Sequence, residues 1–258
     1  MSSVSRIISD RAYQTYEKRL FKAVKESPVP RHVAIIMDGN RRFAEELGLD
    51  GGGHVEGRNK LEELLGWCLE LDIENLTVYA FSTENFTRTD DEVKNLMALF
   101  EKSFREVGDD ERVHKNKIRL RILGQRDLLP DGVQKAIAYA EEKTREYKNY
   151  SFNICVAYGG REEILDALRA VAAKVKSGEL ELEDIDEKLF AQHLYTAELP
   201  DPDLILRTSG EERVSNFLLW QLAYSELYFT DVYWPGLRKI DFLRAIRSYQ
   251  QRKRRLGA

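Results

Sequence analysis

Cysteine is scarce in this chain of 258 residues, which contains only Cys68 and Cys155. The two lie far apart, and neither belongs to a CxxC or Cys/His pattern, so the sequence excludes a zinc module and a disulfide-stapled secreted domain. We expect both residues to be reduced thiols in a hydrophobic core and the protein to be cytoplasmic.

Long hydrophobic runs are also missing. No segment approaches the roughly 20 apolar residues that span a bilayer, and the N-terminus lacks the apolar stretch of a signal peptide. Residues 7–24 instead carry apolar side chains at helical intervals between Lys and Arg residues. Packing of this helix on its own domain is the favoured interpretation, and peripheral association with a membrane is the alternative.

A strong imbalance of charge is absent too. Charged residues make up 33% of the chain but its net charge is only −4, so nucleic acid is not an expected partner. No Pro/Gly/Ser-rich linker, internal repeat or low-complexity segment divides the chain. We therefore predict an N-terminal amphipathic helix over residues 1–28 and one further domain over residues 29–258.

Short β-branched or aromatic runs alternate with longer segments whose apolar residues recur at helical spacing. This alternation predicts a single α/β domain with a central, mostly parallel sheet flanked by helices on both faces. The expected strands are residues 33–37, 76–81, 118–123, 150–157 and 204–207. The expected helices are residues 55–71, 90–107, 131–147, 161–177 and 240–255.

In such a sheet the ligand lies beyond the carboxyl ends of the strands. Small, polar or charged residues follow every predicted strand, which indicates an anion-binding rim. They are Asp38–Asn40, Ser82–Asn85, Gly124, Gly159 with Gly160, and Arg207–Gly210.

The first strand runs directly into Asp38, Gly39, Arg41 and Arg42. The carboxylate can hold a hard cation such as Mg²⁺, and the glycine lets backbone N–H groups approach an anion. The arginines can neutralise the remaining phosphate oxygens. An ordinary Asp-Gly turn is the alternative interpretation.

A second group of phosphate donors is expected from Arg207, Arg213 and Ser215. The alternative is that Arg213 pairs with Glu211 or Glu212 on the surface. Further along the chain, Glu226 stands among apolar and aromatic residues, where an ionised carboxylate needs a cation or a hydrogen-bond donor.

His54 follows three glycines and precedes a predicted helix, a position that favours phosphate binding. The other histidines, His32, His114 and His193, have no such setting. The chain contains no GxxxxGK[ST], DxDxT or GxSxG motif, so a nucleotide-hydrolysing P-loop is not expected.

Four ordered blocks resemble the cis-prenyltransferases, the family of undecaprenyl and dehydrodolichyl diphosphate synthases. The blocks are residues 32–42, 79–88, 203–211 and 215–229, and the resemblance extends over about residues 29–257. It implies a transferase that condenses isopentenyl diphosphate units onto an allylic prenyl diphosphate, farnesyl or geranylgeranyl, with Z stereochemistry. The product would be a long-chain polyprenyl diphosphate, the precursor of a glycosyl carrier lipid, and the enzyme a Mg²⁺-dependent homodimer with an apolar product tunnel.

The resemblance also implies roles for individual residues. Asp38 would bind Mg²⁺, together with Glu226 contributed across the homodimer interface. The proton acceptor is left open among Asp38, Asn40, Ser82 and a phosphate oxygen. The catalytic residues implied are Asp38, Asn40, Ser82, Glu84 and Asn85. The substrate-binding residues implied are Gly39, Arg41, Arg42, Phe43, His54, Phe86, Arg88, Arg207, Arg213, Ser215, Arg255 and Gly257.

Two apolar or basic segments have ordinary alternatives. The stripe of Leu96, Met97, Phe100 and Phe104 would line the product tunnel opposite the helix of residues 55–71, although such a stripe is more often plain core. The terminal Arg255-Leu256-Gly257 would reach the partner's active site, although a basic end is ordinarily a solvated tail.

One departure from the family pattern is Asp50, where relatives commonly carry an arginine. The resemblance therefore does not define which residues complete the allylic diphosphate site or which primer the enzyme prefers. Among the competing functions, a non-catalytic partner subunit would be expected to lack Asp38 and the phosphate donors, which are present here. An all-trans prenyl synthase needs two DDxxD motifs on a helical bundle, and a phosphohydrolase needs a second aspartate two residues after Asp38. The chain shows neither.

Overall fold

The computed structural model describes residues 3–49 and 53–252, and within the first helix it describes side chains from Tyr13 onward. It confirms the α/β class with one six-stranded sheet in the order β3-β4-β2-β1-β5-β6, in which every neighbouring pair is parallel. The strands are β1 His32–Ile36, β2 Asn75–Ser82, β3 Ile118–Leu123, β4 Tyr150–Tyr158, β5 Leu204–Arg207 and β6 Glu226–Phe229.

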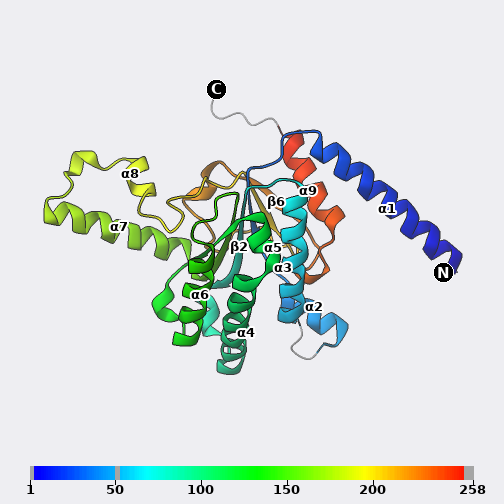
Figure 1. The fold of residues 1–258 in the computed structure, drawn as a ribbon, viewed down its shortest axis with the longest axis horizontal. Coiled ribbons are helices and arrows are strands. Elements are labelled where there is room, and N and C mark those ends of the chain that lie inside the picture. Colours follow the sequence, from blue (N-terminus) through cyan, green and yellow to red (C-terminus); the bar gives the residue numbers. More distant parts are fainter. Residues whose placement is uncertain (1–2, 50–52, 253–258) are drawn as a thin grey trace.

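Helices surround this sheet, as Figure 1 shows. The α-helices of the described residues are α1 Ser3–Lys25, α2 Asn40–Leu47, α3 Gly53–Glu70, α4 Asp90–Asp109, α5 Glu111–Asn116, α6 Asp131–Thr144, α7 Gly160–Ser177, α8 Glu187–Ala191 and α9 Lys239–Gln251. The 3₁₀ turns are η1 Thr83–Thr87, η2 Arg126–Leu128, η3 Leu182–Asp184, η4 Gln221–Tyr224 and η5 Trp234–Gly236.

The two faces of the sheet are covered differently. On one face, Val33 and Ile35 of β1 belong to a large core shared with α3, α4, α6 and α9. On the other face, Ala34 and Ile36 join a smaller core that consists mostly of strand residues and includes Phe217 and Leu218 of an irregular segment. Alternate residues of a strand point to opposite faces, so the continuous burial of β1 is what a central parallel strand requires.

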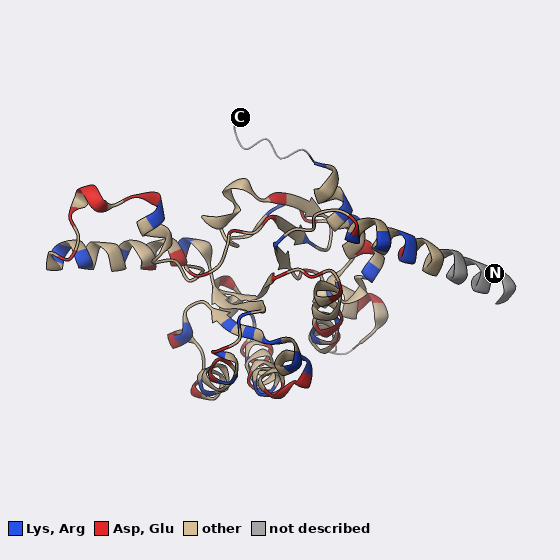
Figure 2. Cartoon of the chain, turned by 45° about the horizontal axis from the view of Figure 1, so that its top comes forward, with Lys and Arg blue, Asp and Glu red and all other residues tan. Residues whose placement is uncertain are grey.

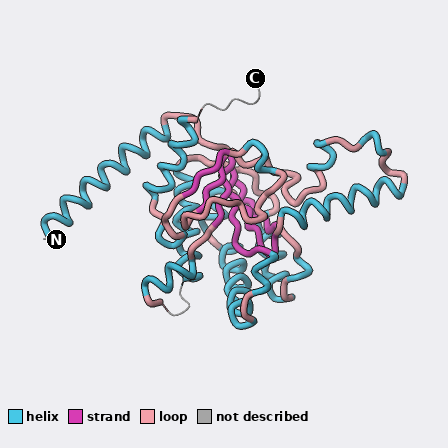
Figure 3. Tube along the Cα trace, turned by 180° about the vertical axis from the view of Figure 1, so that it is seen from behind, coloured by secondary structure: helices cyan, strands magenta, loops and turns pink. Residues whose placement is uncertain are grey.

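Two helices extend away from the body on opposite sides, α1 and α7, as Figures 1 and 3 show. The C-terminal part of α1 is anchored on α9. Leu20 and Val24 are buried, and Gln250 donates a 2.8 Å hydrogen bond to the carbonyl of Val24. No helix in the described part of the chain is both long enough and apolar enough to cross a membrane.

Candidate active site

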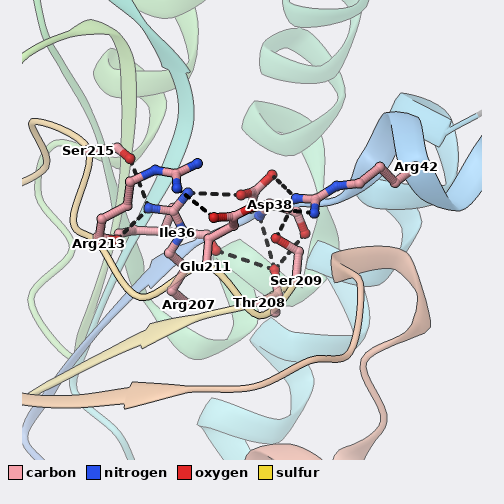
Figure 4. A network of polar contacts seen from close by, with 9 residues as sticks. All are labelled: Ile36, Asp38, Arg42, Arg207, Thr208, Ser209, Glu211, Arg213 and Ser215. Atoms are coloured by element: carbon pink, nitrogen blue, oxygen red, sulfur yellow. Dashed lines mark hydrogen bonds and ion pairs between the residues drawn. The ribbon is translucent and has the colours of Figure 1, made fainter.

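Asp38 follows β1 at the carboxyl edge of the sheet, where two arginines hold its carboxylate (Figure 4). Arg207, the last residue of the neighbouring β5, donates a 2.9 Å hydrogen bond to Oδ2. Arg42, on the first turn of α2, donates a 3.3 Å hydrogen bond to Oδ1. Burial alone would raise the pKa of Asp38, but hydrogen bonds from Arg207 and Ser209 and the two guanidinium charges lower it overall. Asp38 is therefore ionised at neutral pH.

Gly39 makes the tight turn from β1 into α2. Its φ of +102° is a conformation that favours glycine, and an added Cβ would lie only 2.7 Å from a ring carbon of Tyr233. The same Cβ would lie 3.1 Å from Ser209. Any side chain at this position would push Asp38 and Arg42 away from the residues that they contact.

The predicted second group of donors also lies at this edge. The Arg207 guanidinium donates a 2.8 Å hydrogen bond to the hydroxyl of Ser215 and another hydrogen bond to the carbonyl of Arg213. The Arg213 side chain itself pairs with Glu211, which was the alternative interpretation of its sequence. Glu211 also lies 3.6 Å from Arg42, so one carboxylate connects the two groups of cations.

A second carboxylate, Glu92 of α4, lies close to three of the predicted phosphate-binding residues. Its oxygens lie 2.8 Å from Arg88, 3.6 Å from His54 and 3.9 Å from Arg41. Burial and the charge of Arg88 lower the pKa of His54, while Glu92 opposes that shift. Glu92 was not predicted from the sequence, and Glu211 was named only as an alternative partner of Arg213. The only local signal for Glu92 is its position four residues after Arg88.

The segment that carries the predicted site residues Glu84, Asn85 and Phe86 forms η1, directly after β2 on the same rim. Asn85 accepts a 3.1 Å hydrogen bond from the backbone N–H of Ser82 and fixes the start of this turn. Glu84 accepts a 3.0 Å hydrogen bond from the Asn216 amide. The ring of Phe86 packs edge-on against Phe81, with centroids 4.9 Å apart.

A largely apolar cavity of about 160 Å³ is lined by Asn40 and His54 near this rim and by side chains of α3 and α4. Asn40 and His54 lie at its polar end, and the carboxamide oxygen of Asn40 is buried without a hydrogen-bond partner. Met97 is buried but does not line the cavity, so the plain-core alternative applies to that residue. Apolar lining residues include Leu61, Leu65, Leu96, Phe100 and Phe104.

Several predicted site residues are not brought to this rim. Glu226 begins β6 opposite Leu204, whereas Arg207 pairs with Phe229, so within one chain Glu226 lies at the other end of the strand pair from Arg207. Arg252 supplies the cation that Glu226 needs. Arg255, Gly257 and Asp50 lie outside the described residues. Phe43 lies beside Gly236, with its ring 3.6 Å from where a Cβ would stand.

Comparison with known proteins gives a consistent picture. A family described as "Putative undecaprenyl diphosphate synthase" matches residues 36–257. A "Tritrans,polycis-undecaprenyl-diphosphate synthase (geranylgeranyl-diphosphate specific)" of Methanocaldococcus jannaschii is 57% identical over 94% of this chain and 88% of its own length. A protein of the same name from Thermococcus kodakarensis is 54% identical over 100% of this chain and 98% of its own length.

Two solved structures share the fold over nearly the whole chain. Lavandulyl diphosphate synthase from Lavandula x intermedia, in complex with dimethylallyl diphosphate, superimposes with a TM-score of 0.86 at 42% identity, over 89% of this chain and 99% of that one. A probable undecaprenyl diphosphate synthase from Campylobacter jejuni superimposes with a TM-score of 0.73 at 35% identity, over 90% and 100% of the two chains.

Proposed function

Because this chain belongs to the cis-prenyltransferase family, it condenses isopentenyl diphosphate onto an allylic prenyl diphosphate, and we propose that its primer is geranylgeranyl diphosphate. The product is a polyprenyl diphosphate with new Z double bonds. The printed names of the archaeal relatives support the choice of primer. The observation that carries the reaction in this chain is Asp38, held between Arg42 and Arg207 and flanked in the sequence by Met37 and Asn40, which line the apolar cavity.

The two groups of cations suit two diphosphates. Arg41, Arg88 and His54 contact Glu92, and His54 lines the cavity that takes the hydrocarbon tail of the allylic primer. Together with Arg42, whose guanidinium contacts Asp38, they bind the allylic diphosphate. Arg207, Arg213 and Ser215 form the other group and bind isopentenyl diphosphate. In the free enzyme Glu92 and Glu211 neutralise several of these cations, and substrate phosphates replace those carboxylates on binding.

Electrostatic stabilisation by these residues carries the reaction. As the allylic C–O bond breaks, negative charge grows on the departing pyrophosphate, and the guanidiniums that bind it stabilise that charge. The isopentenyl double bond attacks the allylic carbon, which leaves a positive charge on the isopentenyl unit. A proton is then lost from the carbon next to that charge, and this forms the new double bond. The proton acceptor is one of Asp38, Asn40, Ser82 or a phosphate oxygen.

We also propose that Asp38 binds Mg²⁺. The described residues contain no group of three or more His, Cys, Asp or Glu side chains able to hold a metal alone. Magnesium commonly binds through one or two carboxylates together with substrate phosphates, and an ionised, partly exposed Asp38 suits that arrangement. Bound Mg²⁺ would offset the charge of the diphosphate and favour its departure.

A homodimer is the proposed assembly. Helix α7 projects from the body and exposes Leu165 and Leu168, which are 47% and 53% accessible, and Tyr224 beside β6 is 74% accessible. Exposed apolar residues on a projecting element favour burial against a second copy. Such a dimer is also what Glu226 needs in order to reach an active site. Sedimentation equilibrium that shows a monomer at micromolar concentration would overturn this assembly.

We propose a cytoplasmic enzyme that associates with a membrane surface through α1. Lys18, Arg19, Lys22 and Lys25 accompany the apolar residues of this helix, and the helix extends away from the body (Figure 2). Basic amphipathic helices bind anionic lipid surfaces. The enzyme should co-sediment with vesicles containing anionic lipid, and a variant that combines Lys18→Gln, Arg19→Gln and Lys22→Gln should bind them less. Equal binding by the two would overturn this role.

The activity test uses the full chain with Mg²⁺ and labelled isopentenyl diphosphate. Geranyl, farnesyl and geranylgeranyl diphosphate are supplied separately, and product length is analysed by chromatography. We expect the highest yield with geranylgeranyl diphosphate. A clear preference for a shorter primer would overturn the primer proposal alone, while no product from any primer would favour the non-catalytic partner subunit.

A further inference from the structure

Two ion pairs cross the apolar cavity wall between α3 and the α4–α5 segment. Arg58 of α3 lies 2.7 Å from Glu106 of α4, and Glu62, one turn later on α3, lies 3.0 Å from Arg112 of α5. Arg58 and Glu62 are themselves 3.3 Å apart. All four residues line the cavity, and we call them the ionic seam.

The seam lies on the solvent-facing side of the cavity. Its four side chains are 29% to 53% accessible. The opposite boundary is the sheet, where Phe152 and Ile154 of β4 line the cavity and are almost fully buried. The cavity is therefore apolar against the sheet and charged toward water.

We propose that the ionic seam limits the length of the polyprenyl product. This inference rests on the condensation reaction assigned above. A growing hydrocarbon is stabilised as long as each added unit is buried against apolar wall. Once the end of the hydrocarbon reaches the seam, further growth must desolvate charged groups or separate the two ion pairs. The hydrocarbon offers no hydrogen bond or charge that would offset either cost.

A purely structural role for the seam predicts something different. If the ion pairs only tied α3 to α4, their removal would lower thermal stability without changing which product is released. Exposed ion pairs are individually weak, so the effect on stability should be small in either case. Product length therefore separates the two roles.

The first experiment extends the apolar wall with Glu106→Leu and, separately, Arg112→Leu. Each variant is incubated with one fixed primer and excess isopentenyl diphosphate, and products are sized by mass spectrometry. We expect the main product to lengthen by at least one isoprene unit. If a leucine variant does not fold, the product length of the isosteric variants Glu106→Gln and Glu62→Gln is measured instead, because each removes one charge of the seam.

A charge-reversal series tests the ion pair itself. Arg58→Glu and Glu106→Arg, made singly, place like charges together and should lengthen or broaden the products. Because Arg58 also contacts Glu62, the double exchange is made together with Glu62→Gln and should return the distribution toward that of the Glu62→Gln enzyme. Glu101→Leu is the matched control, because Glu101 lies on α4 in a 3.4 Å ion pair with Arg105 but does not line the cavity. Unchanged product length in all seam variants would overturn the proposal, whereas absence of product from the unaltered enzyme would instead refute the assigned reaction.

Discussion

The Nε2 atom of His54 lies 3.6 Å from a carboxylate oxygen of Glu92, on the first turn of α4. Arg88 contacts the same carboxylate, so a histidine and an arginine share one counter-ion at the polar end of the cavity. This arrangement explains why the pKa of His54 is lowered by burial and by Arg88 but raised by Glu92.

Opposite substitutions at these two partners should move the pKa of His54 in opposite directions. Glu92→Gln removes the negative charge and should lower that pKa further, whereas Arg88→Gln removes a positive charge and should raise it. Histidine NMR titration of the free enzyme measures both shifts, with His193 as an internal reference. Movement of the two pKa values in the same direction would contradict the shared counter-ion.

Asp38→Ala should reduce product formation by on the order of 10²–10³-fold, because it removes the carboxylate between the two groups of cations. Arg207, which is only 4% accessible, also loses a partner, so we expect a loss of about 1–3 kcal/mol in the free energy of unfolding. Steady-state rates and denaturant unfolding measure the two effects. If the Asp38→Ala variant makes product at a near-normal rate, the proposal that Asp38 binds the metal is wrong.

A mixture of two inactive variants should test whether Glu226 acts across subunits. In a heterodimer of Asp38→Ala and Glu226→Ala chains, one composite site retains both carboxylates. Random pairing would then restore about a quarter of the normal activity. If Glu226 acts only within its own chain, no activity returns after co-refolding of the two variants.

Widening the cavity should lengthen the product, but only at positions that line it. Phe100→Ala removes a ring from the cavity wall, whereas Met97→Ala removes a buried side chain that does not line the cavity. Both should destabilise the fold by about 2–5 kcal/mol. Product sizing should show longer products for Phe100→Ala alone. Equal product lengths in the two variants would mean that Phe100 is an ordinary core residue and does not line a product tunnel.

Acid should destabilise the fold through His32. Its ring is buried, with one nitrogen 2.6 Å from the Pro200 carbonyl and the other 2.8 Å from the Thr77 hydroxyl, and burial lowers its pKa from 6.5 to about 4. Between these values the unfolded chain binds the extra proton, so stability falls as pH decreases, by about 3 kcal/mol in all. Denaturant unfolding from pH 7 to pH 4 measures the slope, which His32→Gln should flatten. An equal slope in both proteins would contradict this assignment.

The sequence predicted five strands because they carry β-branched residues in apolar runs, which are buried on both faces in β1 and alternate with partly buried arginines in β3. The predictions for β3 and β5 match their observed bounds. The sequence missed β6, whose four residues are only partly buried and carry no such run. It also missed α2, a charged helix of eight residues that begins immediately after Gly39.

The candidate site was predicted where its residues end neighbouring strands and missed where they meet through tertiary contacts. Asp38 and Arg207 were expected together because both follow strands of one parallel sheet. Glu211 became part of the site only because a loop after β5 brings it beside Arg42. Helical spacing placed Met97 in one stripe with Phe100 but left open whether it lines a tunnel or packs in the core, because spacing does not show which neighbouring helix a stripe meets.

The pairing of β1 with β5 places Ile36 opposite Arg207, two residues before Asp38. A shift of β5 by one residue along β1 would turn the Arg207 side chain to the other face of the sheet, because side chains alternate along a strand. The guanidinium would then enter the large apolar core that contains Leu204 and Leu206, and Asp38 would keep only Arg42. Misaligned chains would thus carry an unpaired charge into a dry interior, so the hydrogen-bonded alignment that assembles the catalytic charges also selects against the wrong alignment during folding.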